Sequence, residues 1–481
     1  MRRPSQSSGT ARKGKPQRTQ KKQSTQRRRG STRALGAGSE TLLPPVSAPS
    51  ALSVVKDSSS PASLWFPYAQ MRGMEAPHEV VRAEGTRLHL RDGRVLVDAI
   101  ASWWSVIHGY NHPELNAALR SQLEEFAHVM LGGLVHAPAQ RLADRLVALA
   151  PPGLGHVFFA DSGSVGMEVA MKMAVQFWKN RGVSGKHAFL SLRHAYHGDT
   201  TGVMSLGDPV DGMHRLFSGY LARQHFVPPP EGMGAGRGAV RRSVDEALAL
   251  LATALANYGP SIAAMACEPL MQAAGGFNFY PPAYLAEARR LCDRHEILLV
   301  CDEVATGFGR TGTLFACEQA GITPDIMVLG KGLSAGYLGL SATLATDRVF
   351  DAFLGEAHDK AFMHGPTFMG NALACSVGLA SIDLFVREGY LTKIGRIEDI
   401  LRQELLGLRS PKIRETRVLG ACGVVEVHDR RALEGISEFA ADRGVWLRPF
   451  DRVVYTMPAY VIDEASLRRI CRTMRAWFER G

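Results

Sequence analysis

The feature that most constrains the fold is a regular alternation, in the middle of the chain, between short apolar runs and longer helical patterns. The apolar runs, which end in small or polar residues, occupy positions 156–160, 187–192, 262–269, 297–303 and 326–330. Such runs are typical of strands that are buried on both faces of a parallel sheet. Helical patterns such as Val165–Trp178 and Pro282–His295 lie between them. The alternation predicts an α/β fold with a large, doubly wound, mostly parallel sheet.

A change of pattern after residue 375 indicates a second, smaller domain. A helical stretch runs to Leu408, followed by segments 417–429 and 445–458, which resemble antiparallel strands, and by a C-terminal helix with one apolar face. With 481 residues the chain is too long for one small core. We expect four parts: a disordered basic tail and linker at 1–62, an N-terminal segment at 63–110 that packs with the small domain, a large domain at 111–375 and a small α+β domain at 376–481.

The formal charge of +10 is concentrated in the N-terminal tail. Residues 1–39 contain twelve Arg or Lys and no Asp or Glu, so the rest of the chain sums to about −2. Between Met1 and Leu35 the only aliphatic side chains are Ala11 and Ala34, which excludes the amphipathic face of an organelle transit peptide. We expect a tail that does not fold and that binds polyanions such as nucleic acid only weakly and non-specifically.

Cysteine spacing and hydropathy indicate the compartment. The seven cysteines form no C-x-x-C pair, which argues against a disulfide framework and against a zinc site. No apolar run reaches the roughly 18 residues that a membrane-spanning helix needs. His194, His197 and Asp199 could ligate a metal, but no second ligand cluster accompanies them. We therefore expect a cytoplasmic protein without a metal, in which these three residues have structural or substrate-contact roles.

The strongest indication of a site is the pair Asp302 and Lys331, because each stands at the carboxyl end of an apolar strand-like run. In doubly wound sheets, ligands bind at the carboxyl ends of the strands. A buried carboxylate needs a cationic partner, and a lysine in an apolar site loses proton affinity and becomes a nucleophilic amine. Either residue alone would more often be a solvated charge. Their joint position indicates a reactive site.

A phosphate site is indicated by the turn at Ser162, Gly163 and Ser164, which lies between an apolar run and a helical pattern. Backbone N–H groups at such a junction bind phosphate, although a serine there can also be an ordinary helix cap. The run GFGRTG at 307–312 matches G-x-G-x-x-G but does not stand in a tight turn between a strand and a helix. A nicotinamide site is therefore not expected there.

From about Trp65 onward the chain resembles the class III aminotransferases of the pyridoxal-phosphate fold type I. The resemblance rests on CDEVATGFGRTGTLFACEQAGITPDIMVLGKGLSAG (301–336), and on ASWWSVIHGYNHPELNAAL, FFADSGSVGMEVAMKMA, AYHGDT, FMHGPTFMGNALAC and GVWLRPF. The tryptophan pair, HGPTFMGN and WLRPF resemble the branch of the family that acts in biotin biosynthesis. This implies transfer of an amino group from S-adenosylmethionine, through pyridoxal 5'-phosphate, to 8-amino-7-oxononanoate, giving 7,8-diaminononanoate.

The resemblance implies roles at the cofactor. Lys331 would carry pyridoxal phosphate and later move a proton, and Asp302 would pair with the ring nitrogen. Tyr196 would stack on the ring. The phosphate would be held by Gly163 and Ser164, and by Pro366 and Thr367 of the partner subunit, because members of the family are homodimers.

The resemblance also implies a substrate channel, for which we expect Tyr68, Trp103, Trp104, Tyr196, Asp199, Arg310, Gly365 and Arg448. Tyr68 is in addition a candidate for catalysis, because an aromatic face attracts the sulfonium cation of the donor. The tryptophans suit the apolar chain of the acceptor, and Arg448 suits its terminal carboxylate. Arg448 could otherwise be a surface arginine, and Tyr68 a core residue.

Three alternatives remain open from the sequence. Lysine could be the amino donor to the same acceptor. The chain could be another class III aminotransferase for an ω-amine such as ornithine or 4-aminobutyrate. A more distant alternative is a polyanion-binding protein that acts through its basic tail.

Overall fold

The computed structural model describes residues 63–72, 74, 76–231 and 242–480. The tail predicted at 1–62 lies outside the described residues. The chain forms two compact units, Met1–Pro77 and His78–Gly481. The described residues of the first unit contain turns and bends but no helix or strand. Every element that follows belongs to the second unit.

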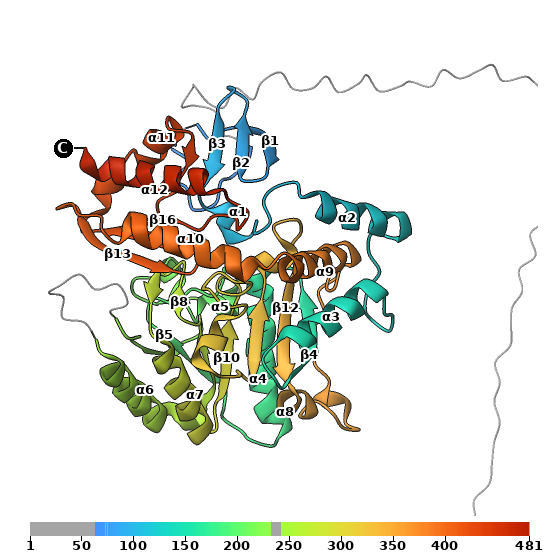
Figure 1. Cartoon of the computed structure of the whole chain (residues 1–481). Coiled ribbons are helices and arrows are strands. Elements are labelled where there is room, and N and C mark those ends of the chain that lie inside the picture. The colour runs from blue at the N-terminus through green and yellow to red at the C-terminus, as the bar shows by residue number, and fades with distance from the viewer. Residues whose placement is uncertain (1–62, 73, 75, 232–241, 481) are drawn as a thin grey trace, which may run out of the picture. The chain divides into compact units, whose positions relative to one another are not determined.

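The core of the second unit is a seven-stranded sheet (Figure 1). Its strands, in spatial order, are β4 (Leu154–Ala160), β12 (Ser341–Thr346), β11 (Ile326–Leu329), β10 (Leu298–Asp302), β7 (Ile262–Cys267), β5 (Ala188–Leu192) and β6 (His225–Val227). All neighbours are parallel except that β12 is antiparallel to both β11 and β4. The predicted α/β class with a mostly parallel sheet is confirmed, and the five predicted strands are all present.

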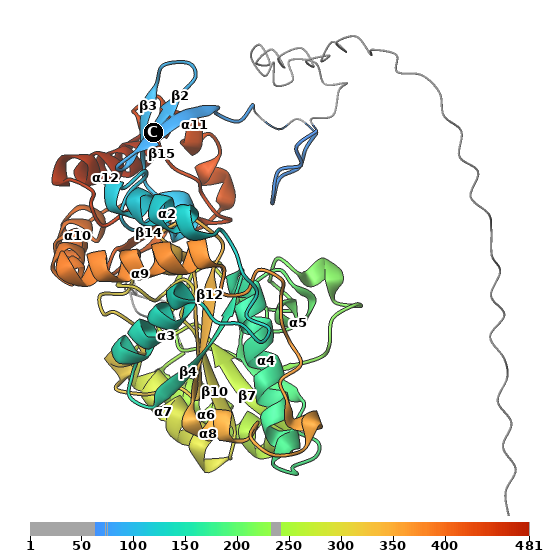
Figure 2. The same ribbon diagram turned by 90° about the vertical axis from the view of Figure 1, so that its right-hand side faces the viewer.

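Helices cover both faces of this sheet. Successive side chains of each strand point to opposite faces, and both sets are apolar, so both faces must be buried. In β10, Leu298 and Val300 pack in one cluster with α4, whereas Leu299 and Cys301 belong to the cluster on the other face. Figure 2 shows α4 on one side of the sheet and α3 and α7 on the other. The helices around the sheet are α2 (Pro113–Glu125), α3 (Ala137–Leu149), α4 (Gly163–Asn180), α5 (Thr201–Met204), α6 (Val244–Tyr258), α7 (Pro282–Arg294), α8 (Asp347–Asp351) and α9 (Ala372–Arg387).

The C-terminal region adds a smaller α+β layer. Its elements are α10 (Tyr390–Leu405), β13 (Ile413–Leu419), β14 (Cys422–Val427), α11 (Ile436–Ala441), β15 (Val445–Trp446), β16 (Val453–Thr456) and α12 (Glu464–Glu479). The strands β13, β14 and β16 form an antiparallel sheet. As predicted from its apolar face, α12 buries Leu467, Ile470 and Met474.

The prediction that 445–458 is wholly antiparallel is wrong at its start. Strand β15 runs parallel to β3 (Val95–Asp98), with Val445 beside Val97 and Trp446 beside Asp98. The sheet continues with β2 (Arg87–Leu90) and β1 (Val80–Glu84). An N-terminal hairpin is thus completed by a strand from near the end of the chain. The expected division of this unit at residues 110 and 375 stays a prediction.

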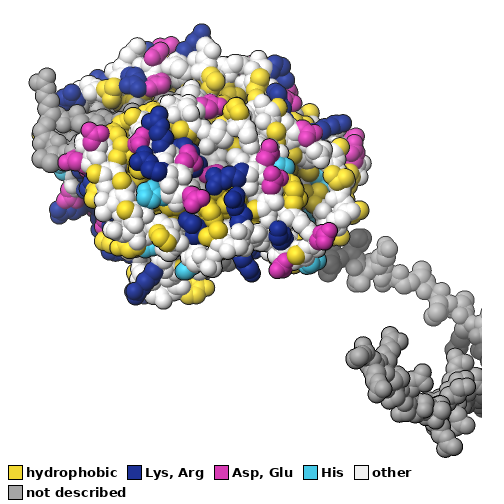
Figure 3. All heavy atoms as spheres, turned by 90° about the horizontal axis from the view of Figure 1, so that it is seen from below, with side chains coloured by type: hydrophobic (Ala, Val, Ile, Leu, Met, Phe, Trp, Pro, Cys, Tyr) yellow, Lys and Arg dark blue, Asp and Glu magenta, His cyan; other side chains and the backbone are white. Residues whose placement is uncertain are grey.

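Basic and acidic side chains are interspersed on the face of the molecule seen in Figure 3. This mixture agrees with the nearly neutral charge of the chain outside residues 1–39. Among the described residues, no helix is both long and apolar enough to cross a membrane.

Candidate active site

The predicted pair lies on neighbouring strands at the carboxyl edge of the central sheet. Asp302 is the last residue of β10 and pairs in register with Val328 of β11. Lys331 stands three residues after Val328, directly after Gly330, at the start of a short 3-10 helix (Lys331–Ser334). Because β4, β5, β7, β10 and β11 all point the same way, the residues that follow them gather at this edge.

Lys331 is held in an unusual position. Its φ of 44° is left-handed, which a side-chain-bearing residue seldom adopts. Its ammonium group lies 5.0 Å from the ring centroid of Trp104. Burial lowers the pKa of Lys331, and the negative charges of Asp302 and Glu268 only partly oppose this effect. A larger share of this amine is therefore neutral and nucleophilic than in a lysine exposed to water.

Asp302 belongs to a buried group of acids and a histidine. One carboxylate oxygen lies 2.7 Å from Nδ1 of His197, and the other accepts the N–H of Val304 at 3.1 Å. Burial alone would lower the pKa of His197, but the hydrogen bond and charge of Asp302 outweigh it and raise the pKa. Asp302 and His197 thus form a buried, hydrogen-bonded pair at this position.

Glu268, which follows β7, is a second buried acid beside this pair. Its carboxylate accepts the N–H of Tyr196 at 3.1 Å and that of Ala273 at 3.2 Å. Burial raises the pKa of Glu268 to about 8, a shift that His197 opposes and the charge of Asp302 supports. Glu268 therefore fixes the backbone of Tyr196 and holds a proton more tightly than an exposed glutamate does.

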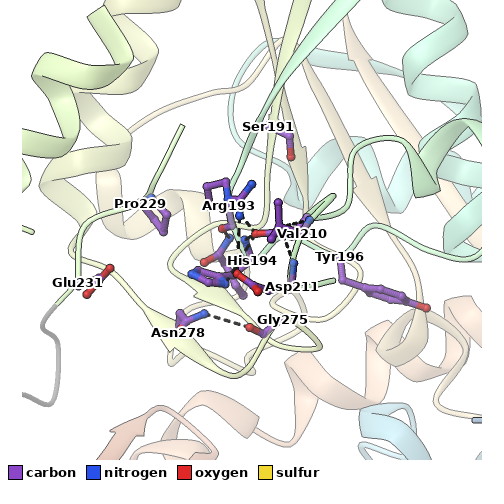
Figure 4. A network of polar contacts seen from close by, with 12 residues as sticks. Ser191, Arg193, His194, Tyr196, Val210, Asp211, Pro229, Glu231, Gly275 and Asn278 are labelled. Atoms are coloured by element: carbon purple, nitrogen blue, oxygen red, sulfur yellow. Dashed lines mark hydrogen bonds and ion pairs between the residues drawn. The ribbon is translucent and has the colours of Figure 1, made fainter. Parts of the chain in front are cut away.

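The segment that carries Tyr196 and His197 leaves β5 and is braced by a network of polar contacts around Arg193 and His194 (Figure 4). Asp208 accepts the N–H groups of His194, Val210 and Asp211 at 2.8, 2.9 and 3.1 Å. The guanidinium group of Arg193 pairs with Asp208 at 3.1 Å. The ligand atoms of His194, Asp208 and Asp211 lie within 4.8 Å of one another. Because Arg193 already supplies the positive charge, we read this cluster as a structural brace.

Tyr196 and Asp199 are linked through His214. The rings of Tyr196 and His214 stack at 5.7 Å with an angle of 29° between their planes. His214 Nε2 lies 3.0 Å from a carboxylate oxygen of Asp199. The structure thus connects two of the predicted site residues through a histidine that the sequence did not single out.

The predicted phosphate turn lies at the start of α4. The Ser162 hydroxyl caps the helix by accepting the N–H of Val165 at 3.2 Å, and the Ser164 hydroxyl accepts the N–H of Asp199 at 3.1 Å. A Cβ atom on Gly163 would lie 2.8 Å from Val304, so this position requires glycine. The turn therefore brings its backbone close to the strand that ends at Asp302.

Trp103 and Trp104 lie in α1 (Ala101–Trp104), whose backbone is not that of a normal helix. All four residues have positive φ angles, from 44° to 74°. We call this segment the aromatic turn. Left-handed backbone costs about 1–2 kcal/mol per residue, so contacts from outside the turn must hold it. Trp104 is buried against Phe277 and Tyr455, while Trp103 is 41% exposed.

The two predicted arginines have different surroundings. The Arg448 guanidinium lies 5.0 Å from the ring centroid of Trp103. Within the described part of the chain it forms no hydrogen bond or ion pair. Arg310 is only 1% exposed, and it donates to the carbonyl oxygens of Pro458, Ala421 and Trp104 at 2.9, 3.3 and 3.4 Å. Arg448 thus has donors left for a ligand, whereas Arg310 ties the aromatic turn to the C-terminal region.

The remaining predicted residues do not join this group within one chain. Gly365, Pro366 and Thr367 lie on a loop between β12 and α9, where the carbonyl of Thr367 is 2.9 Å from His128 Nε2. The loop is exposed at Gly365 and Thr367. Tyr68 belongs to the first compact unit, so its predicted role stays a prediction.

Sequence reasoning missed Glu268 and assigned no charge-pairing role to His197. Glu268 follows an apolar run in the same way as Asp302, so the rule that found Asp302 could have found it. For His197 the sequence predicted a structural or substrate-contact role, without a partner. Its partner lies 105 positions away and could not be inferred from local spacing.

Known proteins resemble this chain over most of its described length. It matches the family described as aminotransferase class III over residues 68–478. It is 44% identical to the adenosylmethionine-8-amino-7-oxononanoate aminotransferase of Mycobacterium leprae, over 86% of this chain and 94% of that protein. The solved structure of the enzyme of that name from Methanocaldococcus jannaschii superimposes with a TM-score of 0.81 at 30% identity, covering 87% of this chain and 97% of that one.

A further solved structure shows the cofactor that such folds hold. The pyridoxal-phosphate-bound amine transaminase from an uncultivated Pseudomonas species has a TM-score of 0.81 at 29% identity, covering 88% of this chain and 100% of that one. The family match, the identity to named enzymes and the sheet-edge amine and carboxylate all agree. The chain therefore belongs to the class III aminotransferases, a family of pyridoxal-phosphate-dependent transaminases.

Proposed function

We propose that this chain transfers the amino group of S-adenosylmethionine to 8-amino-7-oxononanoate, giving 7,8-diaminononanoate for biotin biosynthesis. The relatives that match over 84–86% of the chain carry the name of this activity. The observation that carries the proposal is the combination of two sites. A buried amine and a buried carboxylate follow neighbouring strands at the sheet edge, and an arginine with free donors lies beside an exposed tryptophan.

The residues at the sheet edge fit pyridoxal phosphate. Lys331 offers an amine with a lowered pKa, and Asp302 offers a buried carboxylate hydrogen-bonded to His197. The turn at Gly163 and Ser164 offers N–H groups at the start of a helix, where phosphate binds well. When bound, this cofactor supplies a carbonyl carbon for amine exchange and a ring that accepts electrons.

The side chains of this region then have distinct tasks. The Lys331 amine carries the cofactor and, when released, moves a proton at the substrate carbon. The Asp302 carboxylate would hold a proton on the ring nitrogen, and His197 orients Asp302 through their hydrogen bond. Tyr196, whose backbone is fixed by Glu268, stacks on the ring.

Substrate recognition falls to the aromatic turn and the residues around it. Trp103 and Trp104 wall a channel for the apolar chain of the acceptor, and the Arg448 guanidinium binds its terminal carboxylate. Asp199 and Tyr196 complete the channel, together with Gly365 of the partner subunit. Arg310 acts here mainly by holding the carbonyl of Trp104.

We infer that the active enzyme is a homodimer, in which Pro366 and Thr367 of the partner subunit complete the phosphate site. The loop that carries these residues contacts the segment around His128. Together the two segments expose large apolar side chains, each more than half exposed: Met130, Leu134, Val135, Met363 and Phe368. Exposed apolar side chains that lie together mark an interaction surface. All seven cysteines are buried free thiols, which supports the cytoplasmic location that we propose.

The test is a spectrum of the purified protein titrated first with S-adenosylmethionine and then with 8-amino-7-oxononanoate. The donor should remove the visible absorbance of the bound cofactor, and the acceptor should restore it while 7,8-diaminononanoate accumulates. Lysine and ornithine serve as competing donors in the same assay. If lysine or ornithine converts the cofactor and S-adenosylmethionine does not, the proposed donor is wrong.

A further inference from the structure

We propose that Asp98, together with Tyr110 and Ser102, positions the aromatic turn and thereby sets the preference of the enzyme for a long acceptor with a terminal carboxylate. This inference rests on the proposed function. None of the three residues touches the cofactor site, so they are positioning residues and not catalytic ones.

Asp98 is the last residue of β3 and supplies the acceptors that the turn needs. Its carboxylate accepts the N–H of Ile100 at 2.9 Å and that of Ser102 at 3.1 Å. The Tyr110 hydroxyl donates to the same carboxylate at 2.6 Å and lies 2.5 Å from the Ser102 hydroxyl. These bonds hold backbone N–H groups at the entrance to and inside a segment of four left-handed residues.

The carboxylate of Asp98 is buried and has no cationic partner among the described residues. Asp98 is 3% exposed, whereas Tyr110 is half-buried and Ser102 is exposed, and each hydrogen-bond partner of the Asp98 carboxylate is a neutral N–H or O–H group. Burial raises the pKa of Asp98, while its hydrogen bonds to Tyr110 and to the backbone lower it. A buried carboxyl group is costly unless hydrogen bonds satisfy it, so its presence here needs a reason. The strained backbone supplies that reason. The aromatic turn needs the acceptors of Asp98, and the buried Asp98 carboxylate needs the N–H groups of the turn.

The same strand joins the aromatic turn to Arg448. Asp98 pairs in register with Trp446 of β15, and Arg448 stands two residues after Trp446. The Ala99 carbonyl accepts the N–H of Met457 and the Thr456 hydroxyl, each at 2.8 Å. The turn and the arginine therefore share one support, which fixes Trp103 beside the Arg448 guanidinium at 5.0 Å.

If this support is lost, the turn relaxes and the distal end of the channel changes shape. The groups that carry the cofactor stand on other elements, β10 and the segment after β11. Contacts made by the distal carboxylate should weaken, whereas cofactor attachment should not. Loss of the Asp98 acceptor is thus expected to change the KM for the acceptor far more than the rate with the donor.

The experiment compares Asp98→Ala, Asp98→Asn and Tyr110→Phe in the cofactor-loaded enzyme. We expect the KM for 8-amino-7-oxononanoate to rise about tenfold in Asp98→Ala, the effect of losing a charge-assisted hydrogen bond. Asp98→Asn keeps an acceptor for one N–H and should show a smaller rise. The rate of the donor half-reaction, followed by the visible absorbance, should stay within about twofold of wild type, since a change of about 0.4 kcal/mol is small.

The specificity readout is an amino ketone of the same chain length without the distal carboxylate. Wild type should prefer the natural acceptor strongly, and the Asp98 variants should lose most of that preference. Tyr337→Phe is the matched control, because Tyr337 also donates its hydroxyl at 3.0 Å, to Asn116 in α2. If Asp98→Ala does not fold, Asp98→Asn and Tyr110→Phe decide the question.

The outcomes separate this inference from the proposed function. A wild type that does not turn over 8-amino-7-oxononanoate contradicts the proposed function. A wild type that does, with Asp98 variants whose KM and acceptor preference are unchanged, overturns the positioning role alone. Equal losses with the natural and the truncated acceptor would also overturn it, because they indicate general damage.

Discussion

The sheet edge and the aromatic turn form the two halves of the site by opposite means. At the sheet edge, regular strands end side by side and deliver Asp302, Lys331 and Glu268 to one place. In the aromatic turn, an unfavourable backbone is held by a buried carboxylate and by the carbonyl contacts of Arg310.

The comparison suggests a division of labour. The chemistry of the family is assigned to the part that strand geometry fixes most firmly. The choice of substrate is assigned to the part that a few side chains can reshape. The predictions below test this division.

The largest effect is expected from Lys331→Ala. Without the amine, the cofactor cannot be attached covalently and no group remains to move the proton, so turnover should fall by about 10³-fold or more. The measurement is the visible spectrum of the loaded protein together with kcat. Lys393→Ala, which removes a half-buried lysine paired with Glu388, should change neither. If Lys331→Ala keeps the visible absorbance of the wild type, Lys331 does not attach the cofactor and the proposed role of the sheet edge is wrong.

The next largest effect is expected from a comparison of two buried aspartates, Asp302 at the carboxyl edge of the central sheet and Asp325 at the opposite edge. Asp302→Asn should lower kcat by about 10²–10³-fold, because the charge that holds the ring proton is lost. Asp325→Asn, at the other edge of the same sheet, breaks a buried ion pair with Arg289 at 2.6 Å. It should lower the melting temperature while kcat at 25 °C stays close to wild type. The division of labour fails if Asp325→Asn lowers kcat as much as Asp302→Asn does.

A smaller effect should separate the aromatic turn from the sheet edge. Arg448→Lys keeps the charge but loses the planar fork, so the KM for the acceptor should rise about tenfold with little change in the donor half-reaction. Arg452→Lys is the control, because Arg452 lies close in sequence and pairs with Asp451. An equal change in the rate with the donor would show that the two halves are not independent.

The smallest effect concerns Glu268 and depends on pH. Burial raises its pKa from 4.5 to about 8, so the folded protein holds a proton that the unfolded chain releases. The stability from this group is complete below about pH 4.5 and is lost as the pH rises toward 8. Glu268→Gln does not titrate. When the pH is raised from 5 to 9, its melting temperature relative to that of the wild type should therefore rise by about 2–4 °C. Glu246→Gln, at an exposed helix start, should show no such gain.

Strand positions were predictable where each strand is a continuous apolar run. The predicted run at 297–303 became β10, and the one at 326–330 became β11, each within one residue at either end. Strand β12 was not predicted, because Ser341–Thr346 contains mostly small residues and its pairing with β4 and β11 decides its structure. The parallel pairing of β15 also depends on a strand far away in the sequence.

The position of Asp302 and Lys331 at one edge of the sheet was predictable to the same extent. Asp302 and Lys331 could be found because strand ends share an edge. The aromatic turn could not, because Ala101–Trp104 contains no glycine or asparagine to indicate left-handed backbone. Its conformation comes from Asp98 and from contacts such as that of Arg310 with Trp104, more than 200 positions apart.

The pairing of β3 with β15 has a consequence for biosynthesis. The two strands are separated by about 350 residues. At about 5–20 residues per second, the ribosome needs roughly 20–70 s to deliver the second strand after the first. During that interval the β3 side of the hairpin is an open edge, which is a target for aggregation and for chaperones. A nascent chain lacking its last forty residues can already contain every strand of the central sheet, but it still lacks the strand that completes the N-terminal one.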